Sequence, residues 1–456
     1  MHGLLLAASL LAAAPVADDS SIRSLIADLG SPRFARREAA EAELGRLGRV
    51  ALPSLRAASG DADSEVRARA ESILRRVESS LLSAPTLVRL DFADVPLAEA
   101  LQRINDRDGL KLTLAPEIPA LWGDRRVTLQ SAEPMPFWRA VDALCAAGKL
   151  HYQFGGQGDL DQGDAQFPLY DGFAASQGLF DDHGPFRVQL TGLQYSSEIH
   201  LATEHPGADR ADGDGTRAPA QRAVSTANKQ FFLQMLVGAE PHLAISPGGP
   251  VRVTEATDDR GRSLILPARP DLIQRESGYL GVNPSPLVHL RLDLAHPGPT
   301  AARLRRVRGI IPVTVAMRRS DPLVIPLADP AAKTFRQGRV AISLGEVRVG
   351  LPDQAATIEL AIKSADQGAS PADAGADEGD EIRAVASPQQ LEVLDAAGRT
   401  IPWFPSSSFF NGEEAKLTLT LLDRGAAPAV PAAIRYHGLV RDKADVPFEF
   451  RDLPMP

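Results

Sequence analysis

The chain has 456 residues, 44% of them hydrophobic and 23% charged, which is enough for three or four globular domains. Its formal net charge is −9, but much of that charge falls in one short acidic stretch, residues 365–381. The remainder is close to balanced, so composition indicates neither a nucleic-acid partner nor binding to a membrane surface. Cys145 is the only cysteine, which excludes an internal disulfide.

The N-terminus predicts an export signal. Residues 4–14 form an apolar run that is too short to cross a bilayer but typical of a signal core. Small residues follow, and cleavage is expected after Ala17 or Ala14, which gives a signal peptide over residues 1–17. The alternative is a buried N-terminal helix, which the missing polar face disfavours. The mature protein is expected to be periplasmic or secreted and not an integral membrane protein, because no later apolar run approaches the length of a membrane-spanning helix.

Residues 18–82 predict helices. Pro32 fits the first turn of a helix capped by Ser31, and Asp61 to Ser64 cap a later one. Apolar and basic positions of these two helices repeat at a constant offset, pairing Arg37 with Arg67, Ala40 with Ala70, Leu44 with Leu74, and Leu47 with Val77. With the intervening Leu-Pro-Ser-Leu of residues 52–55, this segment resembles HEAT-type helical repeats. So few repeats normally need a neighbour to pack against.

Residues 86–154 predict a small α+β domain with the order β-α-β, then β-α-β. A strand over 87–92 precedes a helix that starts near Leu97, and a helix over 136–147 lies between two further strands. The string LDFADVPLAEAL of residues 90–101, followed by Gly109-Leu-Lys-Leu, resembles the short N-terminal domain of secretins and TonB-dependent receptors. That resemblance implies a periplasmic protein-docking module, although no pore or barrel sequence follows.

The C-terminal half predicts a duplicated all-β module. Residues 251–264 and 390–401 both predict a strand, a tight turn with Gly261 or Gly398, and a second strand. Apolar strands precede and follow each turn in the same order, at 231–237 and 287–294 in one copy and at 357–362 and 415–422 in the other. Each copy closes with a pair of strands. Arg262 and Arg399 could pair with the turn aspartates or with a partner, and pairing with the aspartates is favoured.

These strands predict two tandem antiparallel β-sandwiches, copy 1 over residues 185–328 and copy 2 over 335–456. The first strands are expected at 186–190 and 340–344. Residues 155–184, rich in Gly, Asp and Gln, predict a linker. Residues 365–381 predict a disordered, exposed acidic loop within copy 2.

No catalytic motif is recognisable, so catalytic, cofactor-binding and metal-binding residues are all expected to be absent. His200 and His205 flank Glu204 but lack a third ligand for a metal. The Asp-rich segments 159–164 and 209–215 lack the closing glutamate of a calcium loop, so ordinary turns are the better interpretation. Cys145 is expected to be a buried, unreactive thiol on the apolar face of its helix.

Residues 401–412 are the most aromatic part of the chain. Trp403, Phe404, Phe409 and Phe410 are the candidate interaction surface if exposed, whereas burial at the end of a sandwich is favoured because clustered aromatic residues usually belong to a core. The sequence thus predicts an exported, non-enzymatic binding or scaffolding protein. Its partners are expected to be periplasmic or envelope proteins, contacted through the α+β domain and the sandwiches. The alternative is a carbohydrate-active or carbohydrate-binding envelope protein.

Overall fold

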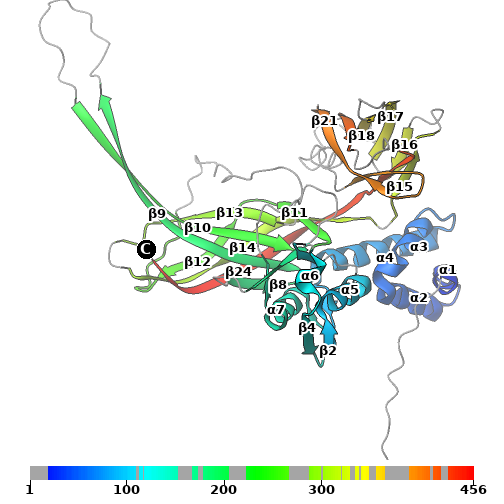
Figure 1. The fold of residues 1–456 in the computed structure, drawn as a ribbon, viewed down its shortest axis with the longest axis horizontal. Coiled ribbons are helices and arrows are strands. Elements are labelled where there is room, and N and C mark those ends of the chain that lie inside the picture. Colours follow the sequence, from blue (N-terminus) through cyan, green and yellow to red (C-terminus); the bar gives the residue numbers. More distant parts are fainter. Residues whose placement is uncertain are drawn as a thin grey trace, which may run out of the picture. The chain divides into compact units, whose positions relative to one another are not determined.

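The structure, a computed structural model, describes most of the chain from Asp19 onward. The described residues are 19–108, 112–116, 118–152, 167–172, 178–204, 222–266, 287–298, 301–319, 321–328, 334–337, 340–348, 356–364, 390–410, 414–422 and 430–455. The chain divides into two compact units, residues 1–81 and 82–456. Helices come first and mostly antiparallel sheets follow, so the fold is of the α+β class (Figure 1). The predicted signal peptide and the acidic loop 365–381 lie outside the described residues.

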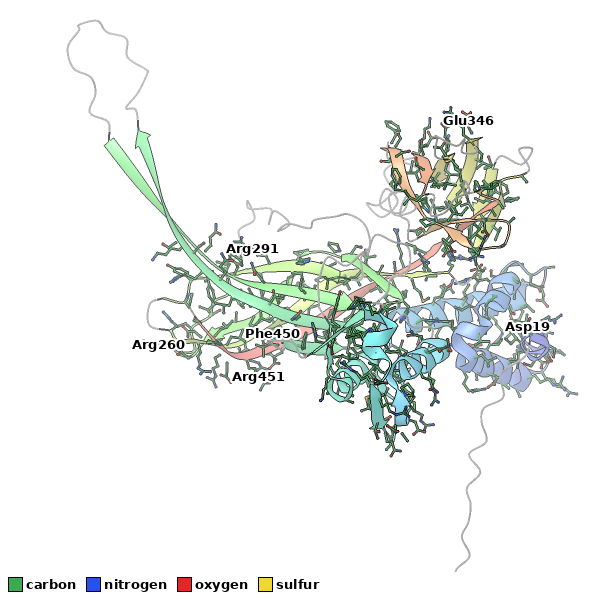
Figure 2. All side chains as sticks on the ribbon, in the orientation of Figure 1. Asp19, Arg260, Arg291, Glu346, Phe450 and Arg451 are labelled. Atoms are coloured by element: carbon green, nitrogen blue, oxygen red, sulfur yellow. The ribbon has the colours of Figure 1, made fainter. Side chains whose placement is uncertain are left out.

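The first unit is helical, and its first helix begins at Asp19 (Figure 2). Its elements are α1 (Asp19–Asp28), α2 (Phe34–Leu47), a short 3-10 helix (Gly48–Ala51), α3 (Leu52–Ala58) and α4 (Ser64–Ser83). Apolar side chains at helical spacing form one buried cluster, which includes Ile22, Ala40, Leu44, Leu52, Leu55, Ala70, Ile73 and Val77. The aligned helices therefore bury their equivalent positions in a common core.

The predicted cap of α2 is wrong. This helix begins at Phe34, later than the sequence indicates, and its N-cap Arg33 makes no side-chain capping bond. The Ser31 hydroxyl instead accepts a hydrogen bond from the Arg33 N–H at 3.3 Å. Its partner therefore precedes the helix, and this bond caps no N–H within α2. The cap of α4 is confirmed, since a carboxylate oxygen of Asp63 accepts the Glu65 N–H at 2.8 Å.

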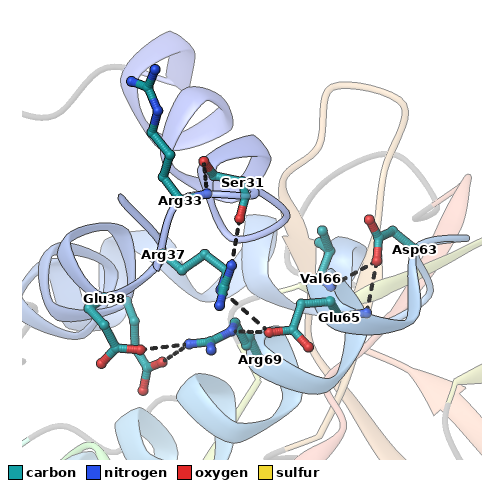
Figure 3. A network of polar contacts seen from close by, with 9 residues as sticks. Ser31, Arg33, Arg37, Glu38, Asp63, Glu65, Val66 and Arg69 are labelled. Carbon is teal, nitrogen blue, oxygen red and sulfur yellow. Dashed lines mark hydrogen bonds and ion pairs between the residues drawn. The ribbon is translucent and has the colours of Figure 1, made fainter. Parts of the chain in front are cut away.

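The entries into α2 and α4 share contacts at the offset that the sequence predicts. Arg37 donates to the Ser31 carbonyl at 2.8 Å, and Arg67 donates to the Asp61 carbonyl at 2.6 Å. Arg69 joins the two helices through its ion pairs with Glu65 on α4 and with two glutamates of α2, Glu38 and Glu41 (Figure 3). The repeat in the sequence is therefore a repeat of local contacts.

The second unit opens with short strands around two twelve-residue helices and one four-residue helix, and the two longer helices with their flanking strands follow the order that the sequence predicts. These elements are β1 (Leu87–Val88), β2 (Asp91–Pro96), α5 (Leu97–Asp108), β3 (Leu112–Ala115), α6 (Pro119–Trp122), β4 (Arg126–Gln130), β5 (Met135–Pro136), α7 (Phe137–Gly148) and β6 (Leu150–His151). Strand β1 pairs with β5, and β2 pairs with β4. The two longer helices, α5 and α7, bury apolar residues in one core, among them Leu97, Ile104, Trp138 and Leu144. We name this part, residues 86–152, the α+β domain.

The linker predicted over residues 155–184 is wrong where the structure describes it. Strand β7 (Phe167–Asp171) lies between β3 and β6, parallel to β3, and strand β8 (Leu179–His183) begins the next sheet. Pro168 and the pair Asp181 and Asp182 are residue types that strands disfavour, which hid both strands in the sequence. Pairing with distant segments overrides that local preference.

The first sheet pair follows, and Figure 1 shows its sheets as two layers. One sheet has the order β13-β10-β9-β8, with β9 at Phe186–Glu204, β10 at Arg222–Ala239 and β13 at Leu287–Leu294. In the other, β11 (Leu243–Pro247) and β12 (Arg252–Asp258) pair with one edge of β14 (Arg303–Arg318), which also pairs with β24 (Leu439–Pro454). Neighbouring residues of β24 take opposite faces, since Phe450 is buried and Arg451 is exposed (Figure 2).

The second sheet pair contains a five-stranded and a four-stranded sheet. The larger has the order β16-β17-β18-β22-β21, with β16 at Thr334–Gln337, β17 at Val340–Arg348, β18 at Thr357–Ser364, β22 at Glu414–Leu421 and β21 at Trp403–Phe410. The smaller has the order β15-β23-β19-β20, with β15 at Leu323–Pro326, β23 at Ala433–Tyr436, β19 at Leu391–Leu394 and β20 at Thr400–Ile401. Side chains of both sheets, including Ile342, Leu360, Val393, Leu417 and Ile434, form one buried cluster.

Four neighbouring strands in one sheet of each pair follow the same order. Neighbours β8, β9, β10 and β13 of the first correspond to β16, β17, β18 and β22 of the second. In both, a strand that the sequence did not reveal, β8 or β16, comes before the predicted first strand. The first-strand predictions at 186–190 and 340–344 were therefore one strand late in both copies. Strand β8 was hidden by its two aspartates, whereas β16 has only four residues.

The two predicted turns occupy equivalent places. Gly261 and Gly398 have φ values of 78° and 77°, the left-handed region that favours glycine. A carboxylate oxygen of Asp258 accepts the Arg262 N–H at 2.8 Å and the other accepts the Arg262 side chain at 2.7 Å; Asp395 and Arg399 make the same two bonds at the same distances. The predicted pairing of arginine with turn aspartate is confirmed in both copies.

The predicted copy boundaries at residues 328 and 335 do not match the strand pairing. Strand β24, from the end of copy 2, pairs with β14 of the first sheet pair, while β15, from the end of copy 1, pairs with β23 of the second. The predicted closing pair within copy 1 is also one continuous strand, β14. Pro312 lies where one neighbouring edge changes from β12 to β11, and on the other edge the pairing with β24 continues through it.

Candidate functional site

The predicted aromatic surface lies on β21, the last strand of the five-stranded sheet. Trp403 is partly buried against the core, and its indole N–H donates to the Leu391 carbonyl at 3.1 Å. Phe404 and Phe409 are 44% and 58% exposed. Burial of the cluster, the favoured interpretation from sequence, is therefore wrong for these two rings. The side chain of Phe410 lies outside the described residues.

The register with β22 explains why these rings are exposed. Phe404 lies opposite Thr420 and Phe409 opposite Lys416, on the face of β22 that is not buried. Pro405 and Ser408 lie on the opposite face, next to the buried Leu419 and Leu417, although at this last strand of the sheet both are themselves exposed. An irregularity between Pro405 and Ser407 inserts Ser406, whose hydroxyl donates to the Thr418 carbonyl at 3.2 Å. Both phenyl rings consequently lie on the outer face.

A second exposed feature is the long hairpin of β9 and β10. Residues 186–190 of β9 pair with β8, and residues 231–238 of β10 pair with β13. Beyond them, residues 196–204 and 222–230 pair only with each other among the described strands. Figure 1 shows the two strands continuing past the ends of β8 and β13. At about 3.4 Å per residue, the nine pairs form a two-stranded ribbon roughly 30 Å long.

The base of this ribbon is fixed by side chains from β13 and beyond. The Arg291 guanidinium lies 3.7 Å from the centre of the Phe232 ring and donates to the Gln230 side chain at 3.0 Å. Tyr195 and His296 contact each other with ring centres 4.7 Å apart. These contacts hold the ribbon where it leaves the sheet.

A buried arginine joins the α+β domain to the first sheet pair. The side chain of Arg187 on β9 is 1% exposed. It donates to both carboxylate oxygens of Asp142 on α7, at 2.8 and 2.7 Å, and to both of Asp182 on β8, at 2.6 Å each. Its guanidinium also lies 5.1 Å from the Trp138 ring and 4.7 Å from the Phe180 ring. Two bidentate pairs between aromatic faces satisfy this buried charge.

The electrostatics of this joint favour the charged arginine. Burial alone lowers the pKa of Arg187, but the hydrogen bonds to Asp182 and Asp142 outweigh it, so the net shift is upward. Tyr152 also accepts a hydrogen bond from this guanidinium, and burial raises the pKa of its phenol. The joint therefore stays charged and hydrogen-bonded at neutral pH, as a structural contact requires.

A second buried charge strengthens the same joint. Glu240, after β10, is fully buried, and its two carboxylate oxygens accept the backbone N–H of Thr86 at 2.9 and 3.2 Å. The indole of Trp138 donates to the Pro185 carbonyl at 3.1 Å, and the Glu240 N–H bonds the same carbonyl at 3.0 Å. Sequence reasoning did not single out Arg187 or Glu240. Asp182 is only five residues from Arg187, but the contacts that bury these charges, with Asp142 and Thr86, come from segments distant in sequence and leave no local pattern.

A polar cluster lies where the two sheet pairs exchange strands. Glu392 on β19 is 3.3 Å from the His437 imidazole, 2.9 Å from Arg435 on β23 and 3.4 Å from Arg318, the last residue of β14. His437, followed by the arginines, lowers the pKa of Glu392 to about 2 despite its partial burial. On the same connection, the Arg319 N–H donates to the Gly438 carbonyl at 2.8 Å. These contacts link the β14–β15 connection to the β23–β24 connection, between the pairing of β14 with β24 and the pairing of β15 with β23.

The remaining candidate residues bring no chemistry together in the described part of the chain. Cys145 is buried as predicted, and burial, with the nearby Asp142, raises the pKa of its thiol to about 12. Among the described residues there is no group of three metal-binding side chains. The side chains of His200 and Glu204, residue His205 and the segments 159–164 and 209–215 lie outside the description.

The sequence matches no family model, and neither the curated proteins nor the solved structures include one similar to it. No helix among the described residues is long and apolar enough to cross a membrane.

Proposed function

We propose that the protein is an exported, non-enzymatic binding or scaffolding protein of the periplasm or cell envelope. In this proposal it contacts other envelope proteins through the α+β domain and the β-sheet modules. The export signal expected at residues 1–17 supports the location.

The observation that carries the proposal is the β9–β10 ribbon. Its outer nine residue pairs have no further strand beside them in the described part of the chain. A two-stranded hairpin is only marginally stable in water, and its open edges present unpaired backbone groups. A chain that extends both strands into such a ribbon gains most if another molecule covers it. Strand addition to an open edge is a common mode of protein recognition.

The joint at Arg187 supports the same function. A docking domain is useful in a scaffold only if its orientation is held, and this joint ties α7 to β8 and β9 through one buried guanidinium. Glu240 adds a second tie, to the start of the α+β domain. We therefore propose that the α+β domain, which resembles the secretin and TonB-dependent receptor docking domain, presents a fixed surface.

The finer architecture belongs to the same proposal. We infer that the first unit is a HEAT-like pair of repeats, because its two helix entries repeat their contacts at the offset found in the sequence. We infer that the two sheet pairs are copies of one β-sandwich module, because strand order and turn chemistry recur. Modules of both kinds commonly present binding surfaces.

The test is a variant in which residues 197–229 are replaced by Asn-Gly, which closes β9 and β10 as a short hairpin. Full-length and shortened proteins are cross-linked in cells that express them, and partners and cell fraction are determined. We expect the full chain in the periplasmic fraction, with cross-linked partners that the shortened chain loses. An unchanged partner set would remove the role of the ribbon, and a cytoplasmic location would overturn the proposal. The matched control is Arg305→Ala, an exposed change on β14.

A further inference from the structure

The sequence of β21 reads nearly the same in both directions. Trp403-Phe404-Pro405-Ser406 is followed by Ser407-Ser408-Phe409-Phe410, so aromatic residues occupy both ends and serines the centre. We propose that β21 is a self-association strand, and that two copies of this chain pair antiparallel along its open edge, the one that no described strand covers. This inference is independent of the function proposed above, because it needs neither export nor a foreign partner.

The faces of β21 agree with such a pairing. A two-fold axis between Ser406 and Ser407 places Phe404 of one copy opposite Phe409 of the other, twice. Both rings lie on the outer face, since their β22 partners are Thr420 and Lys416. An undistorted strand would put residues 404 and 409 on opposite faces, because the side-chain period is two. The inserted Ser406 shifts the alternation by one residue, so that Phe404 and Phe409 lie on the same face. A two-fold antiparallel pairing of two β21 strands requires this arrangement.

The open edge of β21 also lacks the usual protection. Among the described strands that end a sheet, three have eight residues or more: β13, β24 and β21. Charged residues occur throughout β24 and in β13, for example Arg291 and Asp293, whereas β21 has none. Proteins normally guard edge strands with charges or proline against pairing. Pro405 removes one backbone donor, and the irregularity at Ser406 is the other protective feature of β21.

The same features favour a second copy over a different partner. A two-fold pairing sets each residue against its symmetry-related neighbour, so a charged strand would oppose like charges, and an uncharged palindrome avoids that. A foreign strand would place no such symmetry on the sequence. The Phe404–Phe409 contacts would also cover the two most exposed large apolar side chains of β21.

The experiment measures the mass of the purified full chain by sedimentation over a range of micromolar concentrations. We expect a monomer–dimer equilibrium with no larger species, because each copy has one such strand. The variant Phe404→Lys with Phe409→Lys sets like charges opposite each other and is expected to weaken self-association by at least about tenfold. The variant Phe404→Asp with Phe409→Lys sets opposite charges at the same two contacts and is expected to restore the dimer, in a salt-sensitive form.

The control is Val430→Lys, since Val430 lies outside β21 and is 58% exposed, the same as Phe409. It should leave the dimer intact. A monomeric wild-type chain, open-ended aggregation, or a Lys–Lys variant that dimerises like wild type would each overturn the inference. Failure of the Asp–Lys variant to recover what the Lys–Lys variant loses would also overturn it, because the register would then be wrong. None of these results depends on the location or partners of the protein.

Discussion

Substitution of Arg187 by alanine should destabilise the contact between the α+β domain and the first sheet pair. The change leaves Asp142 and Asp182 without their shared cation and removes a guanidinium from between two aromatic rings. Breaking a buried pair by removing one partner costs about 3–5 kcal/mol. The two carboxylates are 47% and 30% exposed and can be rehydrated, so the lower end, about 3 kcal/mol, applies.

Trp138 provides the assay, because it lies beside Arg187 and the chain has only three tryptophans. In a background where Trp122 and Trp403 are phenylalanine, its fluorescence during urea titration follows the joint. With a urea dependence of about 2 kcal/mol per M, the midpoint should fall by roughly 1.5 M. Arg305→Ala, on an exposed position, is the matched control. If Arg187→Ala shifts the urea midpoint no more than this control, the Arg187 contacts do not stabilise the joint by the amount expected.

Four further substitutions test the sheet pairs. Gly261→Ala and Gly398→Ala should each lower the free energy of unfolding by about 1 kcal/mol, measured with heat or urea, because only the left-handed φ opposes the added methyl group. Clearly unequal losses would contradict the equivalence of the turns. Gly309→Ala should cost more, about 3 kcal/mol, because its Cβ would lie 2.9 Å from the Phe448 ring and closer still to a backbone carbonyl; a neutral effect would contradict the packing of β14. The Glu392 carboxyl has a pKa of about 2 in the folded protein and 4.5 as a free side chain. Its ionised form therefore contributes fully to the free energy of unfolding above pH 4.5, and this contribution is lost as the pH falls towards 2. Glu392→Gln should therefore be less stable than wild type by about 3 kcal/mol at pH 7, and the gap should close between pH 4.5 and 2 in acid titrations; a gap that persists at pH 2 would be inconsistent with this.

The parts of the fold that could be predicted are those with local causes. The turns at Gly261 and Gly398 were predictable because an aspartate and a left-handed glycine at fixed spacing specify a tight turn. The helices of the first unit followed from apolar spacing. Strand β8 was not predictable, because Asp181 and Asp182 disfavour a strand until β9 is beside them. The exchange of β15 and β24 was hidden for the same reason, since pairing between strands so distant along the chain leaves no local pattern.

The candidate site also has features that the sequence could predict and features that it could not. The aromatic content of β21 could be read from the sequence, but its exposure depends on one inserted residue, Ser406, and on being the last strand of its sheet. The joint at Arg187 had no local signal, because Asp142 is 45 residues away along the chain. A buried ion pair of this kind is specified only when two elements meet.

The shared strands have a consequence for biosynthesis. Arg303 of β14 pairs with Pro454, which follows it by about 150 residues. The first sheet pair therefore cannot complete its second layer until residues 439–454 have been made, although most of its strands emerge early. Contacts of such long sequence separation form slowly, and until then one edge of β14 stays open. A chain that stops at residue 438 would contain every strand of the second sheet pair and would still leave the first one unfinished.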